Sequence, residues 1–81
     1  MSKESILFEI NRELERAKKV HPEFPESAVE RVAIMAEEAG EAIRAANNYT
    51  YHNGLKDEIK TELIQTASTC IRILEAMEKD E

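Results

Sequence analysis

Apolar residues recur along this chain at helical spacing, in three stretches separated by two short polar segments. The first stretch places five of them on one helical face: Ile6, Leu7, Ile10, Leu14 and Ala17. Ser2 or Ser5 can cap this helix at its start, because a serine side chain accepts a hydrogen bond from a free backbone N–H of the first turn. Pro22 ends the helix, because proline cannot continue it.

The second stretch begins with a capping box, Ser27 followed by Glu30, which predicts a helix from near residue 28. Its main apolar stripe contains eight residues: Ala28, Val29, Val32, Met35, Ala36, Ala39, Ile43 and Ala46. Asn47 and Asn48 are expected to close this helix. The segment 49–54 has turn chemistry and contains both tyrosines, so we expect it to lie outside the helix.

The third stretch runs from about Leu55 to Met77 and presents one broad apolar face. That face comprises Leu55, Ile59, Leu63, Ala67, Cys70, Ile71, Leu74 and Met77. Three helical stretches, two glycines, two prolines and 5% aromatic residues argue against an all-β fold. The 81 residues leave room for one domain, so the sequence predicts a single all-α domain over residues 1–81.

Charge and cysteine content narrow the classes of function. The net charge of −6 repels phosphate backbones and argues against nucleic-acid binding. No apolar run is long enough to span a bilayer, so no membrane partner is expected. The single cysteine excludes an internal disulfide and fits a reducing, cytoplasmic location.

A second row on the middle helix mixes carboxylates with apolar residues, away from the main stripe: Ile34, Glu38, Glu41 and Ala45. The last helix has a row at the same spacing: Glu58, Glu62, Gln65, Thr69 and Arg72. If the rows face each other, three carboxylates converge with one amide. A divalent cation would relieve their repulsion, and oxygen ligands of this kind suit Mg²⁺ or Mn²⁺. The alternative is a solvated, glutamate-rich surface on a plain helical adaptor.

Two motifs in these rows resemble a known family. Residues 37–41 read E-E-x-x-E, and residues 62–65 read E-x-x-Q. Over roughly residues 24–77 the chain resembles the MazG-like all-alpha nucleoside triphosphate pyrophosphohydrolases, whose second motif is E-x-x-D. The resemblance implies a helical bundle completed by homodimerisation, often as a dimer of dimers. It also implies Mg²⁺-dependent cleavage of NTPs or dNTPs to a nucleoside monophosphate and pyrophosphate.

The resemblance assigns a role to each matched position. Glu38, Glu41 and Glu62 would be metal ligands, with Gln65 in the place of the family's aspartate. Glu37 would orient or deprotonate the attacking water. Since Gln65 brings no charge, the pattern also fits a MazG-like bundle with weak or lost catalysis that serves as an oligomeric interaction module.

Two further contacts with a nucleotide are expected from residue type and position. A lysine or arginine should complete the phosphate clamp. Arg72 continues the acidic row, and Lys56 lies on the same helix. Tyr49 and Tyr51 could stack on a nucleobase, or they could pack over the end of the bundle.

Overall fold

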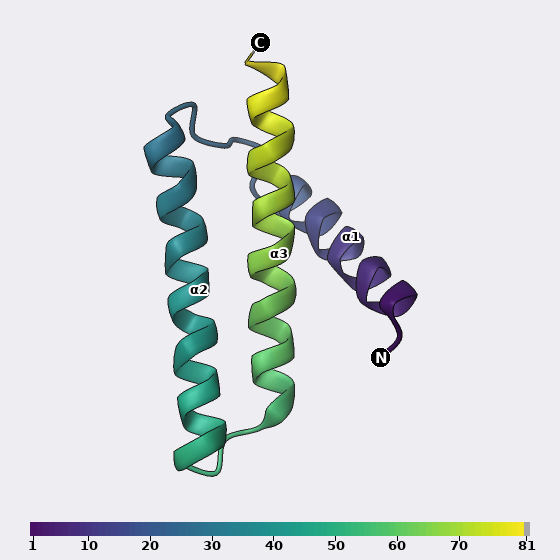
Figure 1. The fold of residues 1–81 in the computed structure, drawn as a ribbon. Coiled ribbons are helices and arrows are strands. Elements are labelled where there is room, and N and C mark those ends of the chain that lie inside the picture. Colours follow the sequence, from purple (N-terminus) through teal and green to yellow (C-terminus); the bar gives the residue numbers. More distant parts are fainter. Residues whose placement is uncertain (81) are drawn as a thin grey trace.

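The computed structural model describes residues 1–80, which form three α-helices (Figure 1). Helix α1 spans Lys3–Val20, α2 spans Ala28–Tyr51 and α3 spans Lys56–Lys79. No strand occurs within these described residues, so the prediction of an all-helical fold is confirmed. Helix α3 lies between the other two: α2 runs antiparallel beside it, and α1 crosses it obliquely on another side.

The helix starts agree with the predicted caps. The side chain of Ser2 accepts a hydrogen bond from the backbone N–H of Ser5, at 3.1 Å. The Ser27 hydroxyl oxygen accepts one from the N–H of Glu30, at 3.4 Å, and α2 starts at residue 28. These local interactions satisfy N–H groups that have no partner inside the helix.

The predicted end of the second helix at Asn47 and Asn48 is wrong. Helix α2 continues to Tyr51, so both tyrosines lie in its last turn rather than in a loop. The Asn48 carbonyl accepts hydrogen bonds from the N–H groups of His52, at 2.9 Å, and Gly54, at 2.8 Å. The helix therefore ends at its C-cap, His52, and the Asn48 carbonyl accepts the hydrogen bonds that close its last turn.

The buried core of the chain is small. Its apolar members are Leu14 in α1, Ala42 and Ala45 in α2, and Ile73 in α3. Ser68 of α3 is also buried. Because alanine and serine have short side chains, α2 and α3 can approach closely at these positions. The face of α2 toward α3 is thus the mixed row that contains Glu38 and Ala45, and not its main apolar stripe.

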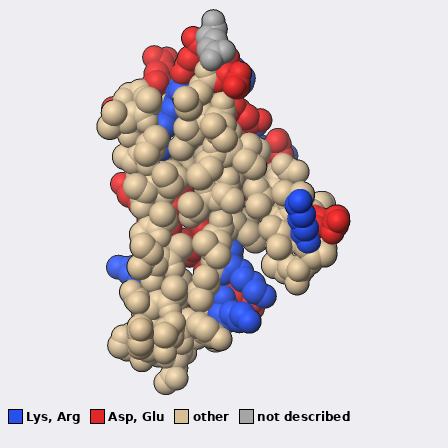
Figure 2. All heavy atoms as spheres, viewed as in Figure 1, with Lys and Arg blue, Asp and Glu red and all other residues tan. Residues whose placement is uncertain are grey.

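The large β-branched residues of the main apolar stripe of α2 are exposed in the single chain, while Met35, Ala39 and Ala46 of that stripe are half-buried. Val29 is 80% exposed and Ile43 65% exposed, and Val32 is also exposed. On α3, the predicted apolar face leaves four large residues exposed: Leu55, Leu63, Leu74 and Met77. Figure 2 shows a broad surface over α2 and α3 with few charged atoms. None of the described helices is long and apolar enough to cross a membrane.

Two arginines fasten the connection between α1 and α2 onto α3. The Arg31 guanidinium donates to the Pro25 carbonyl, at 2.6 Å, and to the Asp80 carboxylate, at 2.7 Å. Arg31 is only 5% exposed. The Arg72 guanidinium donates to the carbonyl of His21, at 2.6 Å. It also lies over the ring of Phe24, 4.4 Å from its centroid, where a cation is attracted to the aromatic face.

Candidate functional site

The two carboxylate-bearing rows line the interface between α2 and α3. Glu38 and Glu41 come from α2, and Glu62 and Gln65 come from α3. The carboxyl group of Glu41 is close enough to that of Glu62 to raise its pKa. Figure 2 shows acidic atoms recessed between the two helices near their middle. The fold therefore places carboxyl oxygens from both helices around one cleft.

Two carboxyl oxygens in this cleft are buried without a hydrogen-bond partner among the described residues. They are Oε1 of Glu38 and Oε2 of Glu62. A buried carboxylate oxygen without a donor costs free energy, because it has lost the water that solvated it. These two atoms therefore mark a place where a cation or a donor group would be bound favourably.

The surroundings of Glu38 favour its neutral form. Burial raises the pKa of the Glu38 carboxyl above its ordinary value, and a hydrogen bond from Thr69 partly opposes this rise. Repulsion from nearby carboxylates adds to the increase; these are Glu13 of α1 and Glu41 and Glu37 of α2. Carboxylates on both α2 and α1 thus repel the ionised form of Glu38 and raise its pKa.

Glu62 is shifted in the same direction. Burial raises the pKa of the Glu62 carboxyl, and repulsion from Glu41 and the contact with its carboxyl raise it further. Glu38 and Glu58 contribute smaller repulsions. Several carboxyl groups therefore lie close together in the cleft. A divalent cation would reduce the repulsion between them at both Glu38 and Glu62.

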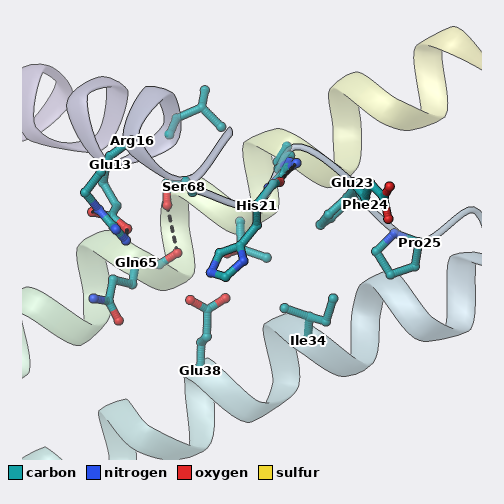
Figure 3. A pocket seen from close by; sticks show the side chains of 14 residues that line it. Glu13, Arg16, His21, Glu23, Phe24, Pro25, Ile34, Glu38, Gln65 and Ser68 are labelled. Atoms are coloured by element: carbon teal, nitrogen blue, oxygen red, sulfur yellow. Dashed lines mark hydrogen bonds and ion pairs between the residues drawn. The ribbon is translucent and has the colours of Figure 1, made fainter. Parts of the chain in front are cut away.

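A cavity of about 400 Å³ opens at one end of this cleft, with walls from all three helices and the α1–α2 connection (Figure 3). Glu38 points into it from α2, while Glu13 and Arg16 lie on its α1 side. Apolar lining comes from Leu14, Phe24 and Ile34; further polar lining includes Gln65 and Thr69. Polar and charged residues make up most of the lining, so the cavity suits a ligand that has charged groups as well as an apolar part.

A smaller cavity of about 220 Å³ lies further along the same cleft, toward the α2–α3 connection. It contains the other two metal-ligand candidates, Glu41 and Glu62. Its remaining lining residues are Arg44, Ala45, Asn48 and Glu58. The four metal-ligand candidates are therefore divided between two adjacent cavities, with Glu38 and Gln65 in the larger one.

Several predicted contact residues lie outside these two cavities. Glu37 is exposed on α2, next in sequence to Glu38. Tyr49 and Tyr51 are exposed in the last turn of α2, and Lys56 is the exposed first residue of α3. Arg72 does line the larger cavity, but its guanidinium is held by the His21 carbonyl and the Phe24 ring.

The structure also brings α1 to the site, which the sequence did not indicate. Arg16 donates two hydrogen bonds to the carboxylate of Glu13, at 2.8 and 2.6 Å. This pair lowers the pKa of Glu13, chiefly through the hydrogen bonding. The i, i+3 spacing of this ion pair within α1 does not indicate which other helix the pair will lie against.

The oxygen ligands offered by the four candidate residues suit a hard cation, although these side chains do not gather around one point. Among residues 1–80, no three His, Cys, Asp or Glu side chains are gathered closely enough to enclose a metal ion in this conformation. Glu38, Glu41, Glu62 and Gln65 offer only oxygen ligands, which Mg²⁺ and Mn²⁺ prefer. Two of their carboxyl oxygens lack donors, so the chemistry of these residues, although not their present spacing, suits such an ion.

Comparisons with known proteins give no family assignment. No protein-family model, curated protein or solved structure matches this chain.

Proposed function

We propose that this protein is a Mg²⁺-dependent nucleotide pyrophosphohydrolase, which converts an NTP or dNTP to the nucleoside monophosphate and pyrophosphate. The observation that carries the proposal is the pair of carboxylate-bearing rows facing each other across α2 and α3, with buried carboxyl oxygens that lack donors. The residues that resemble the MazG-like motifs fall on these rows: E-E-x-x-E on α2, and E-x-x-Q on α3 in place of the family's E-x-x-D.

In this proposal Glu38, Glu41, Glu62 and Gln65 hold Mg²⁺, or Mn²⁺ in its place. The ion supplies Lewis-acid neutralisation of the phosphate charge. Gln65 binds through its amide oxygen and contributes no charge. The cleft supports such binding because its carboxyl groups repel one another and two of their oxygens have no donor.

The remaining chemistry is positioning and proton transfer. Glu37 lies beside Glu38 on α2 and is exposed to solvent, so it can take a proton from the attacking water. The larger cavity, of about 400 Å³, has apolar walls that can accept the nucleoside. Tyr49, Tyr51 and Lys56 lie outside that cavity and would contact a nucleotide only after a side-chain or subunit rearrangement.

We further propose that the active form is a homodimer or a dimer of dimers. The exposed apolar stripe of α2, which includes Val29, Val32 and Ile43, supports this association. A partner that covered this stripe would remove apolar surface from water, the main driving force of protein association. The same stripe gives a second copy a complementary apolar surface to pack against.

A catalytically inactive interaction module is the second candidate. It is favoured by one observation, that Gln65 stands where the E-x-x-D motif has an acidic ligand. The module would keep the exposed apolar stripe and oligomerise through it without turning over nucleotides.

Product analysis separates the two candidates. The purified protein is incubated with a panel of NTPs and dNTPs and with Mg²⁺ or Mn²⁺, and the products are separated by chromatography and assayed for pyrophosphate. We expect nucleoside monophosphate and pyrophosphate, and we expect Glu38→Gln to abolish both. Glu26→Gln, in the exposed α1–α2 connection, is the matched control and should be active.

Two other outcomes would contradict the enzymatic proposal. Nucleoside diphosphate with orthophosphate would show a different bond being cleaved. Absence of turnover with either metal, in a protein that still oligomerises, would favour the interaction module.

A further inference from the structure

Arg44 differs from the other arginines of the chain in having no partner among the described residues. Four of the five arginines are engaged: Arg12 with Glu9 at 3.9 Å, Arg16 with Glu13 at 2.6 Å, Arg31 with Asp80 at 2.7 Å, and Arg72 with the His21 carbonyl at 2.6 Å. Within residues 1–80, Arg44 makes no hydrogen bond, ion pair or contact with an aromatic ring. Its guanidinium therefore retains all its donors.

The position of Arg44 is equally distinctive. It lines the smaller cavity together with Glu41 and Glu62, two of the proposed metal ligands. Arg44 follows Glu38 by six residues, so it lies about 9 Å further along the helix axis, at 1.5 Å per residue. Along α2, Glu41 therefore lies between Glu38, which lines the larger cavity, and Arg44.

We propose that Arg44 binds the pyrophosphate portion of the nucleotide, so that the substrate lies along the cleft in one orientation. The nucleoside occupies the cavity of about 400 Å³, and the β- and γ-phosphates lie toward the cavity of about 220 Å³. This inference rests on the proposed function. It names the residue that binds the leaving group and the direction in which the substrate is held.

The chemistry of the two cavities supports this orientation. The larger cavity has apolar walls from Leu14, Phe24 and Ile34, which suit a base and sugar. The smaller cavity offers the Arg44 guanidinium and the Asn48 amide as donors, beside three glutamates whose charge the proposed cation would offset. A guanidinium can bind a phosphate through two parallel hydrogen bonds, which fixes its position as well as its charge.

The reaction produces charge at the end where Arg44 lies. The oxygen of water bonds to the α-phosphorus, and the bond from that phosphorus to the α–β bridging oxygen breaks. Pyrophosphate leaves with the bridging oxygen and its electron pair, and one proton of the water passes to a carboxylate. Arg44 would stabilise the charge that develops on the leaving group.

Other cations are less suited to this role. Arg72 lines the larger cavity, and its guanidinium is committed to the α1–α2 connection. Lys60, on α3, is 3.9 Å from Asp57 and lines neither cavity of the cleft. Because Lys60 is near the same end of the molecule and carries the same charge, Lys60→Gln is a matched control for Arg44→Gln.

The test measures the affinity for the two products separately. Pyrophosphate and a nucleoside monophosphate are titrated calorimetrically, in the presence of Mn²⁺, into wild-type protein, Arg44→Gln, Arg44→Lys and Lys60→Gln. We expect Arg44→Gln to weaken pyrophosphate binding about 10- to 100-fold, the cost of one or two charge-assisted hydrogen bonds. Binding of the monophosphate should change less than about twofold. Arg44→Lys should recover part of the loss, because lysine restores the charge without the paired donors.

The outcomes distinguish this inference from the proposed function. If the wild-type protein releases pyrophosphate while Arg44→Gln binds it unchanged, the inference about Arg44 is wrong and the enzymatic function stands. If Arg44→Gln instead weakens binding of the nucleoside monophosphate, the substrate lies in the opposite orientation and the inference is also wrong. If wild-type protein binds pyrophosphate through Arg44 without turning over any nucleotide, the binding site stands and the enzymatic function fails.

Discussion

At the scale of single residues, the cleft between α2 and α3 is defined by carboxyl groups held near one another. Glu38 and Glu62 both have pKa values raised by burial first and by neighbouring carboxylates second. Their buried oxygens without donors show that the fold has not neutralised this charge by itself. The raised pKa values mean that these two carboxyl groups oppose folding at pH values where they ionise.

This arrangement predicts how the stability of the metal-free protein depends on pH. The folded state raises the pKa of Glu62, so its protonated form is favoured by folding. That stability is present below the ordinary value of 4.5 and is lost as pH rises through the raised folded value. In Glu62→Gln this loss disappears, so the variant should be more stable than wild type at pH 7 with a chelator present. Urea unfolding from pH 4 to pH 8 measures the difference.

Glu26→Gln is the control for the pH experiment, because Glu26 is exposed in the α1–α2 connection. It should reproduce the wild-type pH dependence. A Glu62→Gln variant that unfolds at lower urea concentration than wild type at pH 7 would show that Glu62 stabilises the metal-free fold, contrary to this account.

In the proposed metal site, Gln65 is the one ligand position without a charge. Gln65→Asp adds a fourth carboxylate beside Glu38, Glu41 and Glu62, and we expect it to tighten Mg²⁺ or Mn²⁺ binding about tenfold, because ligand charge is a main determinant of affinity for hard cations. Calorimetric titration with each metal measures the change. Gln65→Asn has the length of aspartate without its charge and should not tighten binding. Unchanged or weaker affinity in Gln65→Asp would argue against Gln65 as a ligand.

At the scale of helices, α3 holds the molecule together because both other helices pack on it. The α1–α2 connection is fastened to α3 by Arg31 and Arg72, through the carbonyls of Pro25 and His21 and through the Phe24 ring. A further ion pair, Lys18 with Glu75 at 3.0 Å, links the last turn of α1 to α3. These contacts fix the α1 wall of the larger cavity.

Arg31→Gln should therefore loosen this connection. The change removes charge-assisted hydrogen bonds to Pro25 and Asp80 from a nearly buried side chain, and we expect it to lower the free energy of unfolding by about 2–3 kcal/mol. Urea unfolding followed by circular dichroism measures the loss. Asp80→Asn should cost clearly less than Arg31→Gln, because the Asp80 carboxylate is exposed and solvent screens its charge.

Equal effects of Arg31→Gln and Asp80→Asn would contradict that explanation. They would mean that Arg31 contributes to the free energy of unfolding through its ion pair with Asp80, and not through its hydrogen bond to the Pro25 carbonyl. The pKa of Asp80 is lowered mainly by its hydrogen bond from Arg31, so the Arg31→Gln variant should also lose this shift.

At the scale of the whole molecule, the single chain leaves much apolar surface in contact with water. Four residues are buried apolar side chains, of which two are alanines, while large apolar side chains are exposed on every helix, Phe8 of α1 among them. A small domain buries only a modest share of its surface, and many such domains depend on association for stability. We therefore expect the stability of this protein to depend on its concentration.

Ile43→Asp tests this expectation on the apolar stripe of α2. Ile43 is 65% exposed in the single chain, so the substitution should cost the monomer about 0.5 kcal/mol or less. In a dimer that covers the stripe, it would place a charge in an apolar interface and should shift the protein to monomer. Analytical ultracentrifugation of wild type and variant measures the change. Glu30→Asp, on the same helix but off the stripe, should leave the oligomeric state unchanged.

A monomeric wild-type protein at high micromolar concentration would overturn the proposed homodimer. A wild-type dimer that persists in Ile43→Asp would place the interface elsewhere, for example on the exposed apolar residues of α3 or α1.

The sequence by itself determined the features that depend on local interactions. Serine caps at Ser2 and Ser27, apolar periodicity and proline positions predict three helices, because each of these acts within a few residues of itself. The same periodicity predicts that Glu38 and Glu41 share a row, and that Glu62 and Gln65 share another. Spacing along a helix fixes such rows whatever the helix packs against.

Only the tertiary structure decided which rows face each other and which side chains remain free. The sequence could not show that α2 turns its mixed row, and not its apolar stripe, toward α3, because both rows have helical spacing. The small side chains of Ala42, Ala45 and Ser68 make that close packing possible, through contacts far apart in sequence. The same long-range contacts bury Arg31, occupy Arg72 and leave Arg44 free in the cleft.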